Sequence, residues 1–249
     1  MRQVIIILVT ASMVLGWGKT GHRVIGKIAE ENLSPAAQAE LIEIFGHTDL
    51  ARIANWADEV KSDPAWDHAN DWHYCTILEG QEYQGPDDGG RAVQKVSEFT
   101  ALLKKNNLGA KDKQDVLRFI VHIVGDLHQP LHVGNGKDRG GNDVKVSWFY
   151  EDTNLHRVWD SQMIDHMQYS YTEYAQQIQL GMNAEFKAKL LNPDLMEFVN
   201  ESRSLHPQIY DIGEGKLAWE YIYKNRELME DRLLKGGFHL AAILNDIFL

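Results

Sequence analysis

The sequence predicts a single, mainly α-helical domain with one small β element. The chain has 249 residues, a length that fits one large domain or two small ones, and no shift in composition marks a boundary. Apolar residues recur at helical spacing through most of the chain, and one short segment alternates in the way of a β-strand. These observations together predict a helical bundle in which β structure is a minor addition.

The first sixteen residues have the pattern of an export signal. Arg2 gives a short basic start, residues 4–9 give an apolar core, and a small-residue cleavage site follows. The apolar run is too short to cross a bilayer. We therefore expect residues 1–16 to be removed, residues 17–249 to form the mature domain with Trp17 at its N-terminus, and the protein to be secreted or periplasmic.

The strongest helical segment spans residues 115–132. Its apolar residues keep a helical period, and Pro130 stops the helix from running on. Another helix start is marked by Ser34 and Pro35, because Ser caps a first turn and Pro fits the first helical position. The remaining helical patterns cover residues 22–31, 36–45, 50–60, 91–106, 155–167, 172–184, 216–234 and 236–248.

The β element is expected at residues 143–150, where Val, Val, Trp and Tyr alternate with polar residues as in one strand or hairpin arm. Residues 71–78 also have extended character. The segments 61–70, 79–90 and the glycine-rich 134–141 are predicted to be loops, the last of them exposed.

The charge of the chain limits how it could bind a polyanion. Its formal net charge is −11, and an acidic surface is a poor general binder of nucleic acid, since release of counterions requires cationic side chains. A polyanionic substrate would therefore need local attraction, which bound divalent metal ions can supply. Cys75 is the only cysteine, so no disulfide can form within the chain.

Two pairs of metal-binding side chains occur at helical spacing. His122 and Asp126 are four residues apart in the apolar central helix, and His156 and Asp160 repeat this spacing. Residues four apart lie on one helix face, and burying such a pair is costly unless something neutralises it. A metal ion is one partner; a core histidine hydrogen-bonded to a nearby aspartate is the plainer alternative.

The candidate ligands exceed what one zinc ion needs. Five imidazoles and three carboxylates lie in apolar or aromatic surroundings, enough for two or three ions with mixed nitrogen and oxygen ligands, as in catalytic zinc sites. These residues are His22, Asp58, His73, His122, Asp126, His132, His156 and Asp160. His128 lies on another helical face, and we expect it to have a supporting or capping role.

Ordered motifs along the mature chain resemble a known family. They run from WGKTGH through WADEVK, DWHY, HIVGDLHQPLH, GGN and HRVWD to FHLAAILN. The chain resembles the secreted single-strand-specific nucleases with three zinc ions, the S-one/P-one type, which share a helical fold with zinc-dependent phospholipases C. The resemblance implies that fold for residues 17–249.

The resemblance also implies how three zinc ions are held. The α-amino nitrogen and carbonyl oxygen of a mature N-terminal Trp bind one zinc, so removal of the signal would be part of site assembly. The implied ligands are Trp17, His22 and Asp126 for the first ion, Asp58, His73 and His122 for the second, with Asp126 beside it, and His132, His156 and Asp160 for the third.

The implied reaction is hydrolysis of single-stranded DNA and RNA to 5′-phosphate products, with 3′-nucleotidase activity. Two close zinc ions would hold a hydroxide nucleophile, and the third would stabilise the departing oxygen. Asp58, Asp126 and Lys61 are the implied catalytic residues. Lys61 matches a basic position that stabilises charge on the phosphoryl group; a solvated surface lysine is the alternative.

Three further residues are implied to bind substrate. Tyr74 matches an aromatic residue that stacks on a nucleobase, Asn142 belongs to a loop that contacts the nucleotide, and Thr76 stands where relatives often have an aspartate that bonds the base edge. An ordinary core tyrosine and a plain turn are the alternatives for Tyr74 and Asn142. The threonine leaves base preference open.

Two other functions compete with the nuclease. One is a zinc phospholipase C, although those enzymes tend to have glutamate as the last ligand where this chain has Asp160. The other is a non-catalytic zinc-binding or nucleic-acid-binding protein, which the full ligand set and Lys61 disfavour. We expect nucleic acid and 3′-nucleotides as substrates, no stable membrane association, and a monomer.

Overall fold

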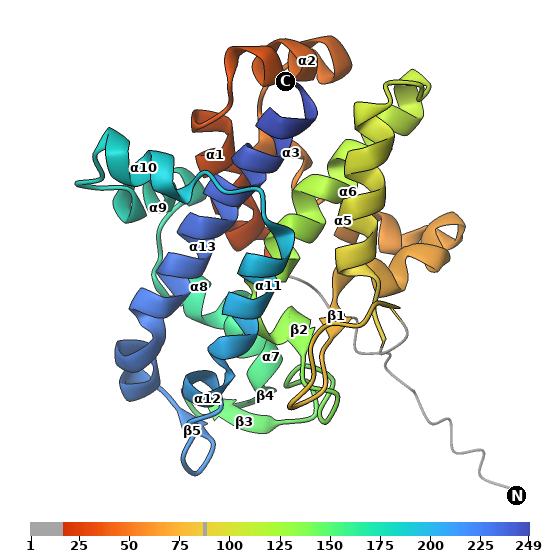
Figure 1. Cartoon of the computed structure of the whole chain (residues 1–249). Helices are drawn as coiled ribbons and strands as arrows, with labels where there is room; N and C mark the ends of the chain where they lie inside the picture. The colour runs from red at the N-terminus through yellow and green to blue at the C-terminus, as the bar shows by residue number, and fades with distance from the viewer. Residues whose placement is uncertain (1–16, 87–88) are drawn as a thin grey trace, which may run out of the picture.

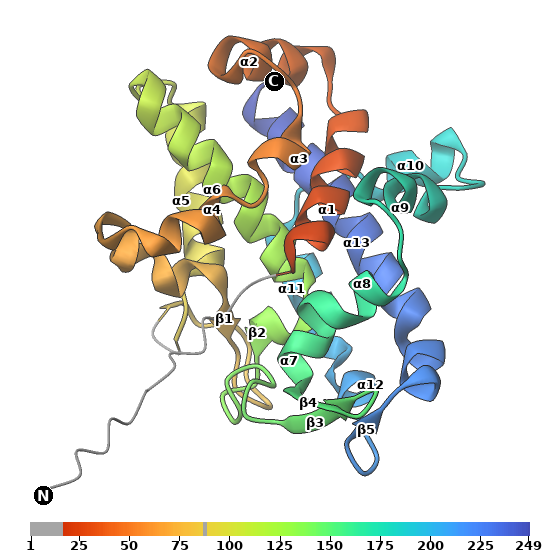
Figure 2. The same ribbon diagram turned by 180° about the vertical axis from the view of Figure 1, so that it is seen from behind.

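The computed structural model describes residues 17–86 and 89–249 and has the mainly helical, single-domain architecture that the sequence predicts (Figures 1 and 2). The export-signal prediction for residues 1–16 lies outside the described residues. Across the described ranges, none of the helices combines the length and apolar character needed to cross a membrane.

Two helices, one from each end of the chain, form the centre of the bundle. Helix α1 (Lys19–Glu31) packs along α13 (Trp219–Ile247), a helix of 29 residues. The prediction of two helices at residues 216–234 and 236–248 was therefore wrong. A Cβ on Gly237 would lie 2.4 Å from the Cβ of Ile28, so this glycine allows close approach of α1 rather than ending a helix.

The predicted central helix is α6 (Ala110–His128), which is bordered by α5 (Ala92–Lys104) on one side and by α13 on another. It ends before Pro130, as expected, and a short 3₁₀ turn, η4 (Pro130–His132), follows. The last two turns of α6 are buried on all sides, which places polar residues there in the core.

Between α1 and α5, the chain forms the predicted helix α2 and then a series of short helical pieces. Helix α2 (Pro35–Phe45) begins at Ser34, whose side chain accepts a hydrogen bond from the Ala37 amide. The predicted helix 50–60 is broken, and the predicted loop 61–70 is mostly 3₁₀-helical. The pieces are α3 (Leu50–Ile53), α4 (Trp56–Glu59), η1 (Val60–Ser62) and η2 (Pro64–His73).

Among the described residues, five short strands make two small sheets. β1 (Cys75–Thr76) pairs in parallel with β2 (Val133–Gly134), so only two residues of the extended segment 71–78 are a strand. β3 (Lys145–Trp148) and β4 (Glu151–Asn154) form an antiparallel hairpin, which confirms the predicted β element, and β5 (Lys216–Leu217) joins β3 in parallel.

The predicted helix 155–167 changes character along its length. It comprises α7 (Leu155–Arg157), the π-helical η5 (Val158–Gln162) and α8 (Met163–His166). π-helical turns are rare and occur frequently at functional sites. The remaining helices are α9 (Tyr171–Ile178), α10 (Ala184–Leu190), α11 (Leu195–Ser204) and α12 (His206–Ile209), of which only α9 had a predicted counterpart, the longer segment 172–184.

Candidate active site

Asp126, near the end of α6, lies at the centre of a buried cluster of imidazoles. Its Oδ1 is 3.2 Å from Nε2 of His22 on α1. Its Oδ2 is 3.0 Å from Nδ1 of His73 on η2 and 3.3 Å from Nε2 of His122, one turn earlier on α6. All four side chains are at most 1% exposed. Three elements distant in sequence therefore direct histidines at one carboxylate.

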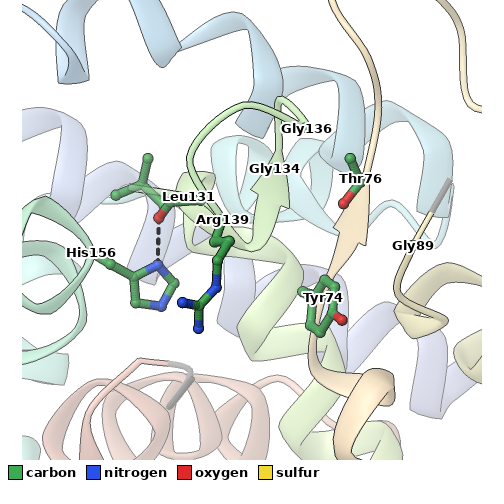
Figure 3. Close-up of a pocket in the computed structure, with 9 residues that line it drawn as sticks. Tyr74, Thr76, Gly89, Leu131, Gly134, Gly136, Arg139 and His156 are labelled. Carbon is green, nitrogen blue, oxygen red and sulfur yellow. Dashed lines mark hydrogen bonds between the residues drawn. The ribbon is translucent and has the colours of Figure 1, made fainter. Parts of the chain in front are cut away.

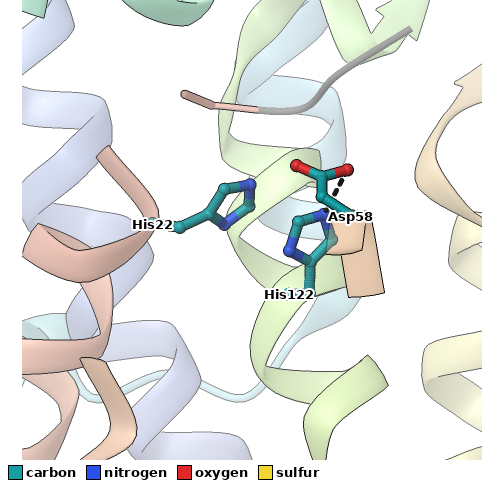
Figure 4. A group of neighbouring side chains, drawn as sticks. All are labelled: His22, Asp58 and His122. Carbon is teal, nitrogen blue, oxygen red and sulfur yellow. Dashed lines mark ion pairs between the residues drawn. The ribbon is translucent and has the colours of Figure 1, made fainter. Parts of the chain in front are cut away.

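Asp58 on α4 approaches the same cluster from another side. Its Oδ1 is 3.5 Å from Nε2 of His122 and 2.7 Å from Nζ of Lys61. Figure 4 shows His22, His122 and Asp58 facing one another across α1, α6 and α4. The rings of His22 and His122 stack with centroids 3.9 Å apart. Lys61 thus pairs with a carboxylate of the cluster and is not a free surface lysine.

A second cluster adjoins the first, formed by His132 on η4, His156 on α7 and Asp160 on the π-helical turn. The Asp160 carboxylate oxygens lie 3.7 Å from His132 Nε2 and 3.1 Å from His156 Nε2. All three residues are buried. His132 Nδ1 bonds the carbonyl of His73, so the two clusters share a hydrogen-bonded wall.

Backbone carbonyls hold the imidazoles in a single orientation. The Nδ1–H groups of three histidines donate to carbonyl oxygens: His122 to Ala54 at 2.7 Å, His132 to His73 at 2.7 Å and His156 to Gly140 at 2.6 Å. With Nδ1 held in this way, each ring turns its Nε2 toward the carboxylates of the clusters. Such outer hydrogen bonds are typical of metal-binding histidines.

Gln129 plays the same part for a carboxylate. It is fully buried, and its Nε2 donates to Asp160 Oδ1 at 2.5 Å while its Oε1 accepts from the Leu131 amide at 2.6 Å. The amide therefore fixes Asp160 against the turn that carries His132. Sequence reasoning did not assign Gln129 a role, and its position inside HQPLH, between two ligand candidates, is the signal that could have identified it.

The donor set fits metal ions. Several buried polar atoms of the first cluster have no hydrogen-bond partner among the described residues, namely both ring nitrogens of His22, Nε2 of His73 and of His122, and Oδ1 of Asp126. Buried polar atoms are rarely left in this condition. Three groups each bring their ligand atoms within 4.8 Å of one another, and the first two share His122: His22, Asp58 and His122; His73, His122 and Asp126; His132, His156 and Asp160.

In the metal-free protein, protons on two of the histidines supply positive charge beside the carboxylates. Burial alone would lower the pKa of His122, but the carboxylates of Asp126 and Asp58 outweigh it and raise this pKa to about 10. Burial likewise lowers the pKa of His132, but Asp126 and Asp160 outweigh burial and raise this pKa to about 9. Burial dominates at His73, whose pKa falls to about 4. The buried carboxylates thus favour positive charge between the imidazoles.

Two glycines allow the ligands to approach. A Cβ on Gly125 would lie 2.9 Å from Nδ1 of His22, so the glycine makes room on α6 for that ring. Gly140 has a left-handed φ of 62°, and a Cβ there would lie 2.1 Å from the carbonyl oxygen of Leu131. Only glycine fits this position, from which the carbonyl of residue 140 reaches His156.

Trp17 is fully buried at the start of the described chain. The amide of the next residue, Gly18, donates to the backbone carbonyl of Asp160 at 2.6 Å. The segment that precedes α1 is thereby joined to the second cluster. The role of the Trp17 amine in binding a metal stays a prediction.

A cavity of about 370 Å³ opens beside the second cluster (Figure 3). Tyr74, Thr76 and His156 line it, as does Arg139, to which sequence reasoning gave no role. Asn142 is buried and does not line the cavity; its side-chain amide donates to the Arg139 carbonyl at 2.9 Å. The tyrosine and threonine predictions therefore concern residues at the cavity, whereas Asn142 shapes the turn behind it.

A model of the family described as S1/P1 nuclease matches residues 17–249. The chain belongs to the S1/P1 nuclease family. Endonuclease 2 of Arabidopsis thaliana is 30% identical over 276 residues, covering 97% of this chain and 94% of the relative. Nuclease S1 of Aspergillus oryzae is 27% identical over 271 residues, 96% of this chain and 94% of the relative. Nuclease P1 of Penicillium citrinum is 29% identical over 157 residues, 59% of this chain and 58% of the relative.

Membership of the S1/P1 family confirms the predicted enzyme class. The chain is a single-strand-specific endonuclease, a hydrolase of phosphodiester bonds whose substrates are nucleic acids. The family assignment favours this reading over the phospholipase and the non-catalytic binding protein.

The side chain of His128 contacts neither cluster of candidate ligands in any described hydrogen bond or ion pair. Its Nδ1 bonds the Val124 carbonyl and its Nε2 bonds Nδ1 of His239 on α13, each at 2.7 Å. Both imidazoles are buried, and burial lowers the pKa of each. This neutral pair joins α6 to α13 behind the ligands.

Proposed function

We propose that this nuclease uses three zinc ions to cut single-stranded DNA and RNA to 5′-phosphate products and to remove phosphate from 3′-nucleotides. The observation that carries the proposal is the meeting of buried, partly unsatisfied imidazoles and carboxylates beside a cavity that offers an aromatic ring. Zinc suits this mixture of nitrogen and oxygen ligands without thiolate.

We propose that Asp126 is shared between the first two ions. His22 and the Trp17 amine and carbonyl would complete one ion, and Asp58, His73 and His122 the other. The distances support a shared Asp126, because its Oδ1 lies near His22 and its Oδ2 lies near His122. His122 also belongs to two of the three groups of candidate ligands. The third ion would be held by His132, His156 and Asp160.

When bound, the zinc ions would supply Lewis acidity at the phosphate and lower the pKa of water. The protein would supply the remaining functions. Lys61, held at 2.7 Å from Asp58, would place a cation where negative charge grows on the phosphoryl group. Tyr74 would stack on a base at the cavity wall, a contact that tolerates any base. The hydroxyl of Thr76 can donate a hydrogen bond to a base edge or accept one from it, but it carries no charge.

The metal count and substrate panel test this proposal. We expect purified mature protein to contain more than two zinc ions per chain by elemental analysis. It should cleave denatured DNA, RNA and a 3′-nucleotide, and a chelator should abolish all three activities. A zinc content near one, or faster hydrolysis of phosphatidylcholine than of denatured DNA, would contradict it.

The amine of Trp17 has its own test. Adding one residue before Trp17 in the mature protein should remove one zinc and most of the activity, because the amine becomes an amide that cannot bind metal. A matched control adds one residue after Leu249, which is 99% exposed at the other end of the chain. Unchanged turnover in the N-terminally extended protein would sink the terminal-amine role.

Export and oligomeric state complete the proposal. We propose that residues 1–16 are removed during export, which would place the enzyme outside the cytoplasm, and that the mature enzyme is a monomer. N-terminal sequencing of the exported protein should begin at Trp17, and sedimentation should give the mass of one chain. A start at another residue would argue against the cleavage site.

A further inference from the structure

We propose that Arg139 is a phosphate-binding residue of this nuclease, which holds the substrate phosphate against the second cluster while the base lies toward Tyr74. The inference rests on the proposed function. It begins with the position of the side chain: Arg139 lines the cavity together with His156 and Tyr74, and Figure 3 shows its guanidinium extending into the space between their rings.

Arg139 is the only cationic side chain that lines this cavity within residues 17–86 and 89–249, apart from the histidine ligand, and no described acidic side chain lines it. The chain as a whole is strongly acidic, with a net charge of −11. A phosphate entering the cavity would therefore find local attraction from this guanidinium. Its planar fork of N–H donors matches two phosphate oxygens at once.

The turn that carries Arg139 is fixed to the metal site. Gly140, the next residue, gives its carbonyl to Nδ1 of His156, and Gly141 donates its amide to the Asp138 carboxylate at 2.8 Å. The backbone that carries the guanidinium is thus hydrogen-bonded to His156, a proposed ligand of the third ion. A phosphate bound to that ion would present its outer oxygens to Arg139.

The guanidinium is available for a substrate. Its nearest acidic partner, Asp143, lies 3.6 Å away, and the two side chains are 59% and 54% exposed. Ion pairs as open as this are weak and give way readily to a stronger partner.

The backbone at Arg139 gives an independent argument. Its φ is 55°, in the left-handed region that favours glycine and disfavours larger residues. Glycine would form this turn without the conformational cost that arginine has here. A costly backbone conformation next to a binding cavity therefore suggests that the arginine side chain has a function. The guanidinium is thus presented at a cost in backbone conformation.

The test compares zinc-loaded, full-length mature variants. Arg139→Gln removes the charge, Arg139→Lys keeps charge but loses the fork, and Arg139→Gly removes the side chain while relieving the left-handed strain. Arg157→Gln is the matched control, since Arg157 follows His156 but is exposed and does not line the cavity. The probes are inorganic phosphate and a 5′-nucleoside monophosphate, each as a competitive inhibitor of 3′-nucleotide hydrolysis.

We expect Arg139→Gln to raise both inhibition constants by the same factor, about 10- to 100-fold, as for the loss of hydrogen bonds to a charged group. Arg139→Lys should lie between it and the wild type. Arg139→Gly should bind phosphate as weakly as Arg139→Gln while its melting temperature equals or exceeds that of the wild type. Arg157→Gln should change neither constant by more than about twofold. Zinc content should stay constant in all four.

Three results would overturn the inference. Inhibition constants of Arg139→Gln within twofold of the wild type would leave the guanidinium without a role. A rise for the nucleotide alone, with inorganic phosphate unchanged, would place it on the base. A loss of zinc would make it a support of the metal site. Failure of the wild type to cleave nucleic acid would instead contradict the proposed function.

Discussion

Asp126 combines full burial with contacts to three imidazoles, so its charge cannot be lost without consequence. We expect Asp126→Asn to lower kcat/KM by more than about 100-fold, because a neutral amide binds zinc poorly and leaves the ring nitrogens of His22 and His73 without a counter-charge. Elemental analysis should show the loss of zinc in parallel. Retention of full zinc content with near-normal turnover would contradict the shared-carboxylate model.

Tyr74 should give a different kinetic pattern. Tyr74→Ala removes a stacking surface worth ~1–3 kcal/mol, which corresponds to a rise in KM of about 5- to 150-fold on single-stranded substrate. Zinc content and kcat should change little, because the ring lines the cavity and is not among the grouped metal donors. A fall in kcat with constant KM would place the ring in the chemical step instead.

Gln129 tests whether the orientation of a ligand matters as much as its identity. Gln129→Leu keeps the volume but removes the hydrogen bond to Asp160 and the one from the Leu131 amide. We expect a loss of about 10- to 100-fold in zinc affinity or activity, the usual effect of removing a residue that supports a metal ligand. Gln208→Leu, at an exposed glutamine on α12, is the control and should behave as wild type.

At this scale the sequence identified residues by type and spacing and missed residues that act through geometry. The pairs His122–Asp126 and His156–Asp160 could be predicted, since four-residue spacing places side chains on one helix face. Arg139 could not, because an arginine in a glycine-rich loop is an ordinary surface residue until the fold directs it at a cavity, and the only signal for Gln129 was its place between the ligand candidates of HQPLH.

Helix α6 depends on a glycine for the fit of its neighbour α1. Ala is preferred to Gly in a helix by about 1 kcal/mol, so Gly125→Ala would stabilise an isolated helix. Here the new methyl would lie 2.9 Å from Nδ1 of His22 and displace that ring. We expect the variant to fold normally but to lose about one zinc per chain and at least 10-fold in activity.

The control for this change is Gly109→Ala, at the start of the same helix, where a Cβ would meet only Asp112 Oδ2 at 3.8 Å. It should leave zinc content and activity unchanged. Equal behaviour of the two variants would show that the space beside His22 is not required.

The elements themselves were predicted well where their hydrophobic period is long and local, as in α1, α2, α5 and α6. Prediction failed where the reason for a residue is tertiary. Gly236 and Gly237 looked like a break, but they continue α13 because Ile25 and Ile28 of α1 pack against them. It also failed over residues 50–73, where single turns are too short to show a period.

For the whole molecule, the zinc-free protein should lose stability in alkaline solution. The pKa values of His122 and His132 are raised from 6.5 to about 10 and about 9 in the folded chain. Between these values and 6.5 the folded state holds protons that the unfolded state has released, so the stabilisation is complete below pH 6.5 and is lost as the pH rises through 9 to 10.

Thermal unfolding at pH 7, 8, 9 and 10, with and without zinc, checks this. We expect the melting temperature of the chelated protein to fall across this range more steeply than that of the zinc-loaded protein, which shares every other titrating group. Parallel curves for the two forms would mean that metal and protons do not compete for the cluster.

The ligand groups come from positions as far apart as His22 and Asp160, and the cluster unites α1, α4, η2, α6, η4, α7 and the π-helical turn. Each bound ion would therefore act as a reversible cross-link that closes long loops, a task for which a chain with one cysteine has no covalent means. The ions that would be needed for catalysis would thus also protect the chain from proteases, because a cross-linked chain unfolds less readily. Under zinc starvation such an enzyme would be digested rather than stored idle, so its abundance would follow the metal supply.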